Sequence, residues 1–205
     1  MYYYCERIDS SFWSEPLNAI TNIAFLIVAL ILLLNYKNNN LAKNCAYLII
    51  CIGIGSFLFH TIPTRITGMM DTFSIALLVI YYIYNVNPSI FRIHPYYSIL
   101  IVIIFPLICI VFGSVLKNSF LGSSAFYIPI LVYLALIATI LWIRDNPVKK
   151  GMIITTLVFT LSICMRILDL KICHIVPFGS HFMWHILNAS TIYFAVKSLI
   201  KIKNT

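Results

Sequence analysis

Seven stretches of mostly apolar residues dominate this sequence and constrain its fold more than any other feature. Each has close to the roughly 20 residues that a helix needs to cross a bilayer. They lie near residues 17–35, 43–61, 68–86, 97–115, 124–143, 150–168 and 182–201. Only 10% of all residues are charged, whereas a soluble domain carries about 25%. We therefore expect an all-α, polytopic membrane protein built as a seven-transmembrane-helix bundle.

The segments between these stretches are short and polar, and none resembles a linker or a soluble domain. We therefore expect a single membrane domain over residues 1–205, with an N-terminal strap over residues 1–16. The strap carries charges of both signs. It lacks the short basic start and the small-residue cleavage site of a signal peptide, so we do not expect it to be removed.

The basic residues predict how the chain is oriented. Seven crossings place the two termini on opposite sides of the membrane. Five of the 14 Lys and Arg residues would lie on the N-terminal side and the other nine on the C-terminal side. Because basic loops stay cytoplasmic, we expect a cytoplasmic C-terminus and a non-cytoplasmic N-terminus. The basic face would contact anionic lipid, and the sequence indicates neither a nucleic-acid partner nor an obligate protein partner.

Ionisable and polar residues collect at one end of the predicted bundle. Such residues are costly inside membrane helices and usually mark function. Odd-numbered stretches begin on the N-terminal side and even-numbered ones end there, so residues from four stretches should meet at that end. They are Glu15, Ser56, His60, Asp71, His181 and His185. We therefore expect an active site facing the non-cytoplasmic side.

The spacing of three histidines favours a metal site. His181 and His185 are four residues apart, as are Ser56 and His60, so each pair shares one helix face. Three imidazoles suit a catalytic zinc that keeps a water in its fourth position. Asp71 follows His60 closely enough to move a proton at that water. These residues predict a metal-dependent hydrolase.

Two other interpretations fit the same residues. Buried histidines often form only hydrogen bonds between helices, and a seven-helix receptor or transport protein could hold a structural zinc. A structural zinc normally has four protein ligands, whereas this cluster comes with a carboxylate and a serine. The pattern therefore favours an enzyme.

Four blocks of sequence resemble a known family. They are YCERIDSSFWSEPLNAITN at 4–22, GSFLFHT at 55–61, Asp71, and GSHFMWHILNA at 179–189. In these blocks and their order the chain resembles the alkaline ceramidases of the CREST superfamily, which are seven-helix membrane hydrolases. The SxxxH, D and HxxxH pattern is typical of the superfamily, and CE followed by FWSEPLN points to the ceramidase branch.

The resemblance implies a reaction and roles for individual residues. It implies zinc bound by His60, His181 and His185, with Asp71 acting on the water there. Ser56 would lie beside the metal and help to hold the substrate or the oxyanion. The implied reaction is hydrolysis of the ceramide amide to a sphingoid base and a fatty acid. A zinc hydrolase of another lipid amide or ester remains an alternative.

Some members of this family also bind calcium near the zinc. Glu6 and Glu15 match the acidic residues that this binding requires, and Asp9 could contribute. Two departures weaken the match: Tyr3 stands where the family has an aspartate, and the segment from Cys5 to Glu15 is about two residues short. The alternative is an ordinary solvated N-terminus.

The resemblance also implies a disulfide between Cys5 and Cys173, both expected on the N-terminal side. An oxidising compartment would permit this bond, and two free thiols are the alternative. The four other cysteines fall within apolar stretches and are expected to pack as small apolar residues. They are Cys45, Cys51, Cys109 and Cys164.

The remaining polar residues near the site are expected to have structural roles. Arg166 and Asp169 lie three residues apart at the end of the sixth stretch, so they could pair with each other. We expect them to organise the loop before His181 and not to take part in chemistry. His94 and His174 fall in expected loops and are not expected to bind metal.

Overall fold

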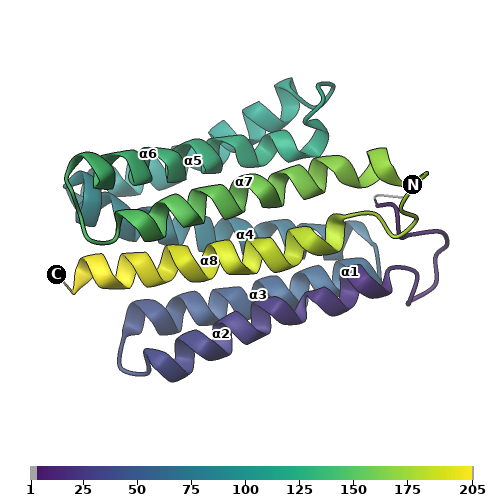
Figure 1. The fold of residues 1–205 in the computed structure, drawn as a ribbon, viewed down its shortest axis with the longest axis horizontal. Coiled ribbons are helices and arrows are strands. Elements are labelled where there is room, and N and C mark those ends of the chain that lie inside the picture. Colours follow the sequence, from purple (N-terminus) through teal and green to yellow (C-terminus); the bar gives the residue numbers. More distant parts are fainter. Residues whose placement is uncertain (1–3, 205) are drawn as a thin grey trace. The chain divides into compact units, whose positions relative to one another are not determined.

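Helices make up all of the regular secondary structure in residues 4–204, which are the residues that the computed structural model describes. They are α1 (Pro16–Thr21), α2 (Ile23–Asn35), α3 (Asn40–Thr61), α4 (Arg65–Val86), η1 (Asn87–Phe91), α5 (Pro95–Val115), η2 (Gly122–Tyr127), α6 (Ile128–Ile143), α7 (Lys149–Ile172) and α8 (His181–Lys203) (Figure 1). The all-α prediction is confirmed. Residues 1–3 of the expected strap, with Tyr3, lie outside the described residues.

Each predicted apolar stretch coincides with helical structure to within a few residues. Among the described residues, six helical segments are long and apolar enough to cross a membrane, which indicates a multi-pass membrane protein. These segments are Pro16–Asn35, Asn40–Thr61, Arg65–Phe91, Pro95–Val115, Gly122–Ile143 and Lys149–Ile172. The expected seventh, α8, has 23 residues but does not belong to this set. Polar residues such as His181, His185 and Lys197 make it less apolar than the others.

The first predicted stretch is interrupted where one unbroken helix was expected. Asn22 separates α1 from α2. Its side-chain amide donates to the carbonyl oxygens of Asn18, at 2.8 Å, and Ala19, at 3.3 Å. Asparagine side chains compete in this way with the regular hydrogen bonds of a helix, which explains the break.

The chain forms two compact units. The first comprises Met1–Leu78 and Leu161–Ala189, and the second comprises Val79–Thr160 and Ser190–Thr205. All the polar residues predicted to form the site belong to the first unit. The second unit holds α5, η2 and α6, with a core cluster that includes Phe105.

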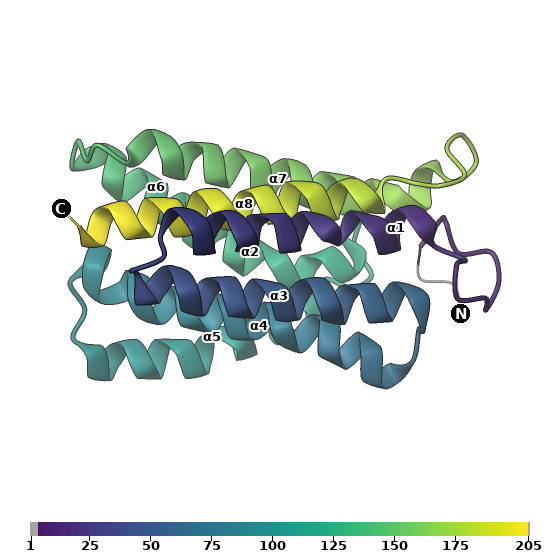
Figure 2. The same ribbon diagram turned by 90° about the horizontal axis from the view of Figure 1, so that it is seen from below.

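In the first unit, α1 and α2 run alongside α3 (Figures 1 and 2). Phe25, Ala29 and Leu32 are almost completely buried on α2, as is Ile49 on α3. The α2 residues recur every three or four positions, which gives that helix an apolar face. Packing of α1 and α2 on α3 places Glu15, just before α1, beside the end of α3.

Candidate metal centre and active site

Three buried imidazoles meet in the first unit. His60 is in the last turn of α3, and His181 and His185 are in the first two turns of α8. Their ring centroids lie 5.2 Å apart for His60 and His181, 4.9 Å for His60 and His185, and 4.7 Å for the two α8 histidines. One ligand nitrogen from each lies within 4.8 Å of the other two. The three side chains could therefore hold a metal ion.

Two of these rings are oriented by neighbours on α1 and just before it. His60 Nδ1 lies 2.6 Å from the Glu15 carboxylate, and His185 Nδ1 lies 2.9 Å from the Thr21 hydroxyl. An ionised carboxylate can only accept, and the Thr21 hydroxyl already donates to the Leu17 carbonyl at 2.7 Å. We therefore assign both Nδ1 atoms as protonated, which leaves each Nε2 lone pair available for a metal.

His181 completes the cluster in a different way. The ring of Tyr4 stacks on it with 3.7 Å between centroids. Its Nδ1 is buried and has no hydrogen-bond partner among the described residues. A buried polar atom without a partner is unusual and needs an explanation. The cluster therefore fits a metal ion, because metal coordination is a further way to satisfy a buried imidazole.

Ser56 and Asp71 lie next to each other close to His60. Gly55 lets α3 and α4 approach closely, because a Cβ at Gly55 would lie 3.1 Å from the Met70 carbonyl oxygen and 3.2 Å from the Asp71 nitrogen. The Ser56 hydroxyl donates to the half-buried Asp71 carboxylate, which is also within electrostatic range of His60. The structure thus brings both residues predicted to be catalytic to the end of α3 that carries His60.

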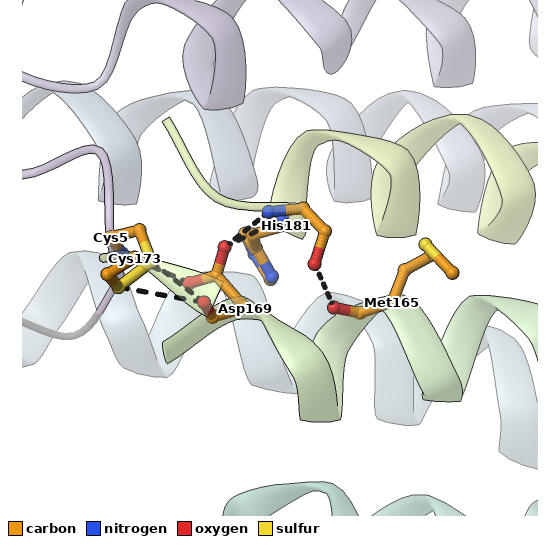
Figure 3. The surroundings of a disulfide bond; sticks show 6 residues. Cys5, Met165, Asp169, Cys173 and His181 are labelled. Atoms are coloured by element: carbon orange, nitrogen blue, oxygen red, sulfur yellow. Dashed lines mark hydrogen bonds between the residues drawn. A yellow bond between two sulfur atoms is a disulfide. The ribbon is translucent and has the colours of Figure 1, made fainter. Parts of the chain in front are cut away.

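Asp169 connects three parts of the chain around His181 (Figure 3). Its Oδ1 accepts from the backbone amides of Ser180, at 2.8 Å, and His181, at 2.9 Å. Its Oδ2 accepts from the amide of Cys5 at 3.0 Å. A carboxylate that accepts the first amides of a helix stabilises that terminus. Asp169 therefore fixes the start of α8, as expected of a residue that organises this loop.

A glycine is required just before α8. Gly179 has a φ of +65°, and a Cβ there would lie 2.0 Å from Asp169 Oδ1 and 2.7 Å from the Cys5 Cβ. Any side chain at this position would displace the carboxylate from the amides that it caps. Gly179 therefore permits the close approach of Asp169 to the start of α8.

Cys5 and Cys173 form a disulfide, as the family resemblance predicted. Their Cα atoms are 5.4 Å apart, although 168 residues separate them in the sequence. Figure 3 shows the bond beside Asp169, at the end of α7. The disulfide and the hydrogen bond from the Cys5 amide together fasten the strap to Asp169, which also holds the start of α8.

Two of the acidic residues predicted as calcium ligands have other partners in the first unit. The Glu6 carboxylate accepts from the amides of Leu17 and Asn18 at 2.7 and 2.9 Å, so it stabilises the start of α1. Burial raises the pKa of Glu6, although the two amides favour its charged form. Asp9 is exposed and accepts from the amide and the hydroxyl of Ser11.

Glu15, the third predicted calcium ligand, is only 2% exposed. It forms an ion pair with Arg7 and accepts from His60 Nδ1. Burial by itself would raise the pKa of Glu15, but hydrogen bonds and charges from His60, Asn18 and Arg7 lower it below its ordinary value. The charged carboxylate of Glu15 is thus held against Nδ1 of His60.

Three residues around the histidines were not predicted from the sequence: Tyr4, Arg7 and Thr21. The positions of Tyr4 and Arg7 depend on the path of an irregular strap, for which hydrophobic periodicity gives no signal. Thr21 follows Asn18 by three residues, on the polar face of α1, so the helical spacing could have indicated it.

Comparison with known proteins assigns this chain to one family. A search among curated proteins finds no match for this chain. The sequence profile of the Ceramidase family, by contrast, matches residues 3–204, which is nearly the whole chain and includes every residue of the site described above. This match supports a hydrolase of the ceramidase type, and the chain belongs to the Ceramidase family.

Proposed function

We propose that this protein is a zinc-dependent integral-membrane amidase. It hydrolyses ceramide, or a ceramide-like lipid, to a sphingoid base and a fatty acid. The observation that carries the proposal is the convergence of three buried histidines from α3 and α8 in a chain of the Ceramidase family. The nearby carboxylate of Asp71 adds a group that can transfer protons.

The metal we propose is zinc, bound by His60, His181 and His185. Neutral imidazoles suit zinc, and a catalytic zinc typically has three protein ligands. When bound, zinc would polarise the substrate carbonyl and lower the pKa of a water molecule. Glu15 and Thr21 hold two of the three rings through Nδ1, and such contacts raise the affinity of a site for its metal.

In this proposal Asp71 is the general base and then the general acid. Its carboxylate accepts a proton as water adds to the amide carbon. It then donates that proton to the amide nitrogen, so that the C–N bond breaks and a neutral amine leaves. The hydrogen bond from Ser56 would keep the carboxylate of Asp71 oriented through both steps.

We propose further that α8 crosses the membrane as a seventh span and that the site faces the non-cytoplasmic side. With its 23 residues, α8 is long enough to cross, and its polar residues near His181 are those that the site requires. The Cys5–Cys173 disulfide supports this orientation, because such bonds persist in oxidising compartments and are rare in the cytosol.

The test is release of fatty acid from ceramide by the purified protein in detergent. Wild type and His174→Ala should both release it, since His174 is an exposed loop residue. His181→Ala should release none above background. If the wild type binds zinc but leaves ceramide intact, ceramide is not the substrate, and other lipid amides and esters should be assayed in the same way.

A further inference from the structure

Arg7 is a buried cation next to the proposed metal centre. The residue is only 4% exposed, although it lies in an irregular strap. Its Nε donates to Glu15, its Nη1 to the Asp9 carbonyl at 3.2 Å, and its Nη2 to the His60 carbonyl at 2.7 Å. Because a guanidinium stays protonated in proteins, a permanent positive charge lies at this position.

Arg7 contacts His60 directly and also through Glu15. It contacts the backbone of His60 directly, at the end of α3, where the carbonyl groups carry partial negative charge. It also binds Glu15 Oε1, while Glu15 Oε2 lies 2.6 Å from His60 Nδ1. Arg7, Glu15 and His60 therefore form a chain of charge-assisted contacts that ends at a proposed metal ligand.

The acidic residues of the strap do not fit a calcium ion. Calcium takes six to eight oxygen ligands. Both oxygens of Glu15 accept hydrogen bonds, Oε1 from Arg7 and Oε2 from Asn18 as well as His60. The Glu6 oxygens accept from two amides of α1. A calcium ion at Glu15 would also have to displace the guanidinium of Arg7, which already neutralises this carboxylate.

We propose that Arg7 takes the place of calcium in this protein, so that zinc binding and hydrolysis proceed without calcium. Its guanidinium is a positioning group that keeps Glu15 against His60. This inference rests on the proposed zinc site. It predicts a protein that is insensitive to calcium and in which the affinity for zinc depends on Arg7.

The first test measures calcium directly on wild type. Purified, zinc-loaded protein should hold no stoichiometric calcium after dialysis against calcium-free buffer, and millimolar calcium should leave its melting temperature unchanged. About one tightly held calcium ion per chain, or a clear rise in melting temperature on adding calcium, would overturn the proposal. Neither measurement requires ceramide hydrolysis, so the result does not depend on the substrate.

The second test measures zinc affinity by competition with a chromophoric chelator. Arg7→Ala should weaken zinc binding by about 10- to 100-fold, the usual effect of losing a group that orients a metal ligand. Arg7→Lys should restore part of this loss, because lysine keeps the charge but not the planar fork. Arg65→Ala removes an exposed arginine and should bind zinc as wild type does.

The outcomes of the second test are distinct. If Arg7→Ala melts at a lower temperature but binds zinc with wild-type affinity, Arg7 serves only to fold the strap and the proposal is wrong. If Arg7→Ala does not fold, Arg7→Lys and the calcium measurements on wild type decide. If wild type itself binds no zinc, the proposed function fails, while the calcium measurements still test whether Arg7 excludes that ion.

Discussion

The Asp169 carboxylate accepts a hydrogen bond from the backbone amide of His181 at 2.9 Å. A residue of α7 thereby fixes the first residue of α8, which is also a proposed metal ligand. The same carboxylate holds the amides of Ser180 and Cys5. The position of His181 is therefore determined by a buried charge and not by apolar packing alone.

Asp169→Ala should destabilise the protein strongly. The substitution leaves three backbone amides without their acceptor, and hydrogen bonds to a charged group contribute about 1.5–3 kcal/mol each. We expect a loss of at least about 3 kcal/mol, measured by denaturant titration in detergent. Asp145→Ala is the control: its exposed pair with Lys149 is screened by solvent and should contribute little to stability. Equal losses in both variants would contradict the role given to Asp169.

Breaking the disulfide should loosen the strap. Cys5→Ser and Cys173→Ser should each lose about 2–4 kcal/mol, the typical contribution of a native disulfide. Reductant should lower the melting temperature of wild type and leave both variants unchanged. Cys51→Ser, at an exposed free cysteine, should behave as wild type does, including its response to reductant. A wild type that is insensitive to a reductant shown to cleave the bond would argue against a stabilising disulfide.

Asp71→Asn should separate catalysis from metal binding. The amide cannot accept the proton from water, so kcat should fall by about 10²- to 10⁴-fold, while zinc content stays as in wild type. Ser56→Ala removes one hydrogen bond to Asp71 and should lower kcat by about 10-fold. Thr72→Ala, next to Asp71 but bonded within its own helix, should leave kcat unchanged. Loss of zinc from Asp71→Asn would instead make Asp71 a metal ligand.

Glu15→Gln should lower the affinity of the metal site for zinc, because Glu15 holds the ring of His60. The neutral amide loses the ion pair with Arg7 and is a poorer acceptor for the protonated Nδ1 of His60. Zinc affinity should drop by about 10- to 100-fold, measured by chelator competition. Glu6→Gln is the matched control, since Glu6 caps α1 and should affect stability more than zinc affinity. If Glu6→Gln lowered zinc affinity more than Glu15→Gln did, Glu15 would not be the residue that supports His60.

The helices could be predicted because long apolar runs specify them almost without regard to context. The histidine cluster could also be predicted, since alternating crossings place the end of one span beside the start of another, and spacing by four residues gives each pair a common face. Whether α8 crosses the membrane could not be settled in this way, because the polar residues that build the site also reduce its apolar character.

The partners of the strap could not be predicted. Arg7 is a charged residue in an irregular segment, where solvent exposure is the usual outcome, yet it is buried against Glu15 and His60. Asp169 binds the amide of Cys5, which lies 164 residues away in the sequence. Every residue other than proline has a backbone amide, so the sequence does not indicate which amide Asp169 binds. This contact depends on the three-dimensional path of the chain.

The proposed function requires a metal ion held by His60, His181 and His185 for cleavage of a ceramide-like amide. Its most direct test is to strip the purified protein of metal, add zinc back in steps, and measure bound zinc and ceramide hydrolysis in the same samples. We predict that activity rises with occupancy and saturates at about one zinc ion per chain. Full activity in protein that holds almost no metal would show that hydrolysis does not require the metal.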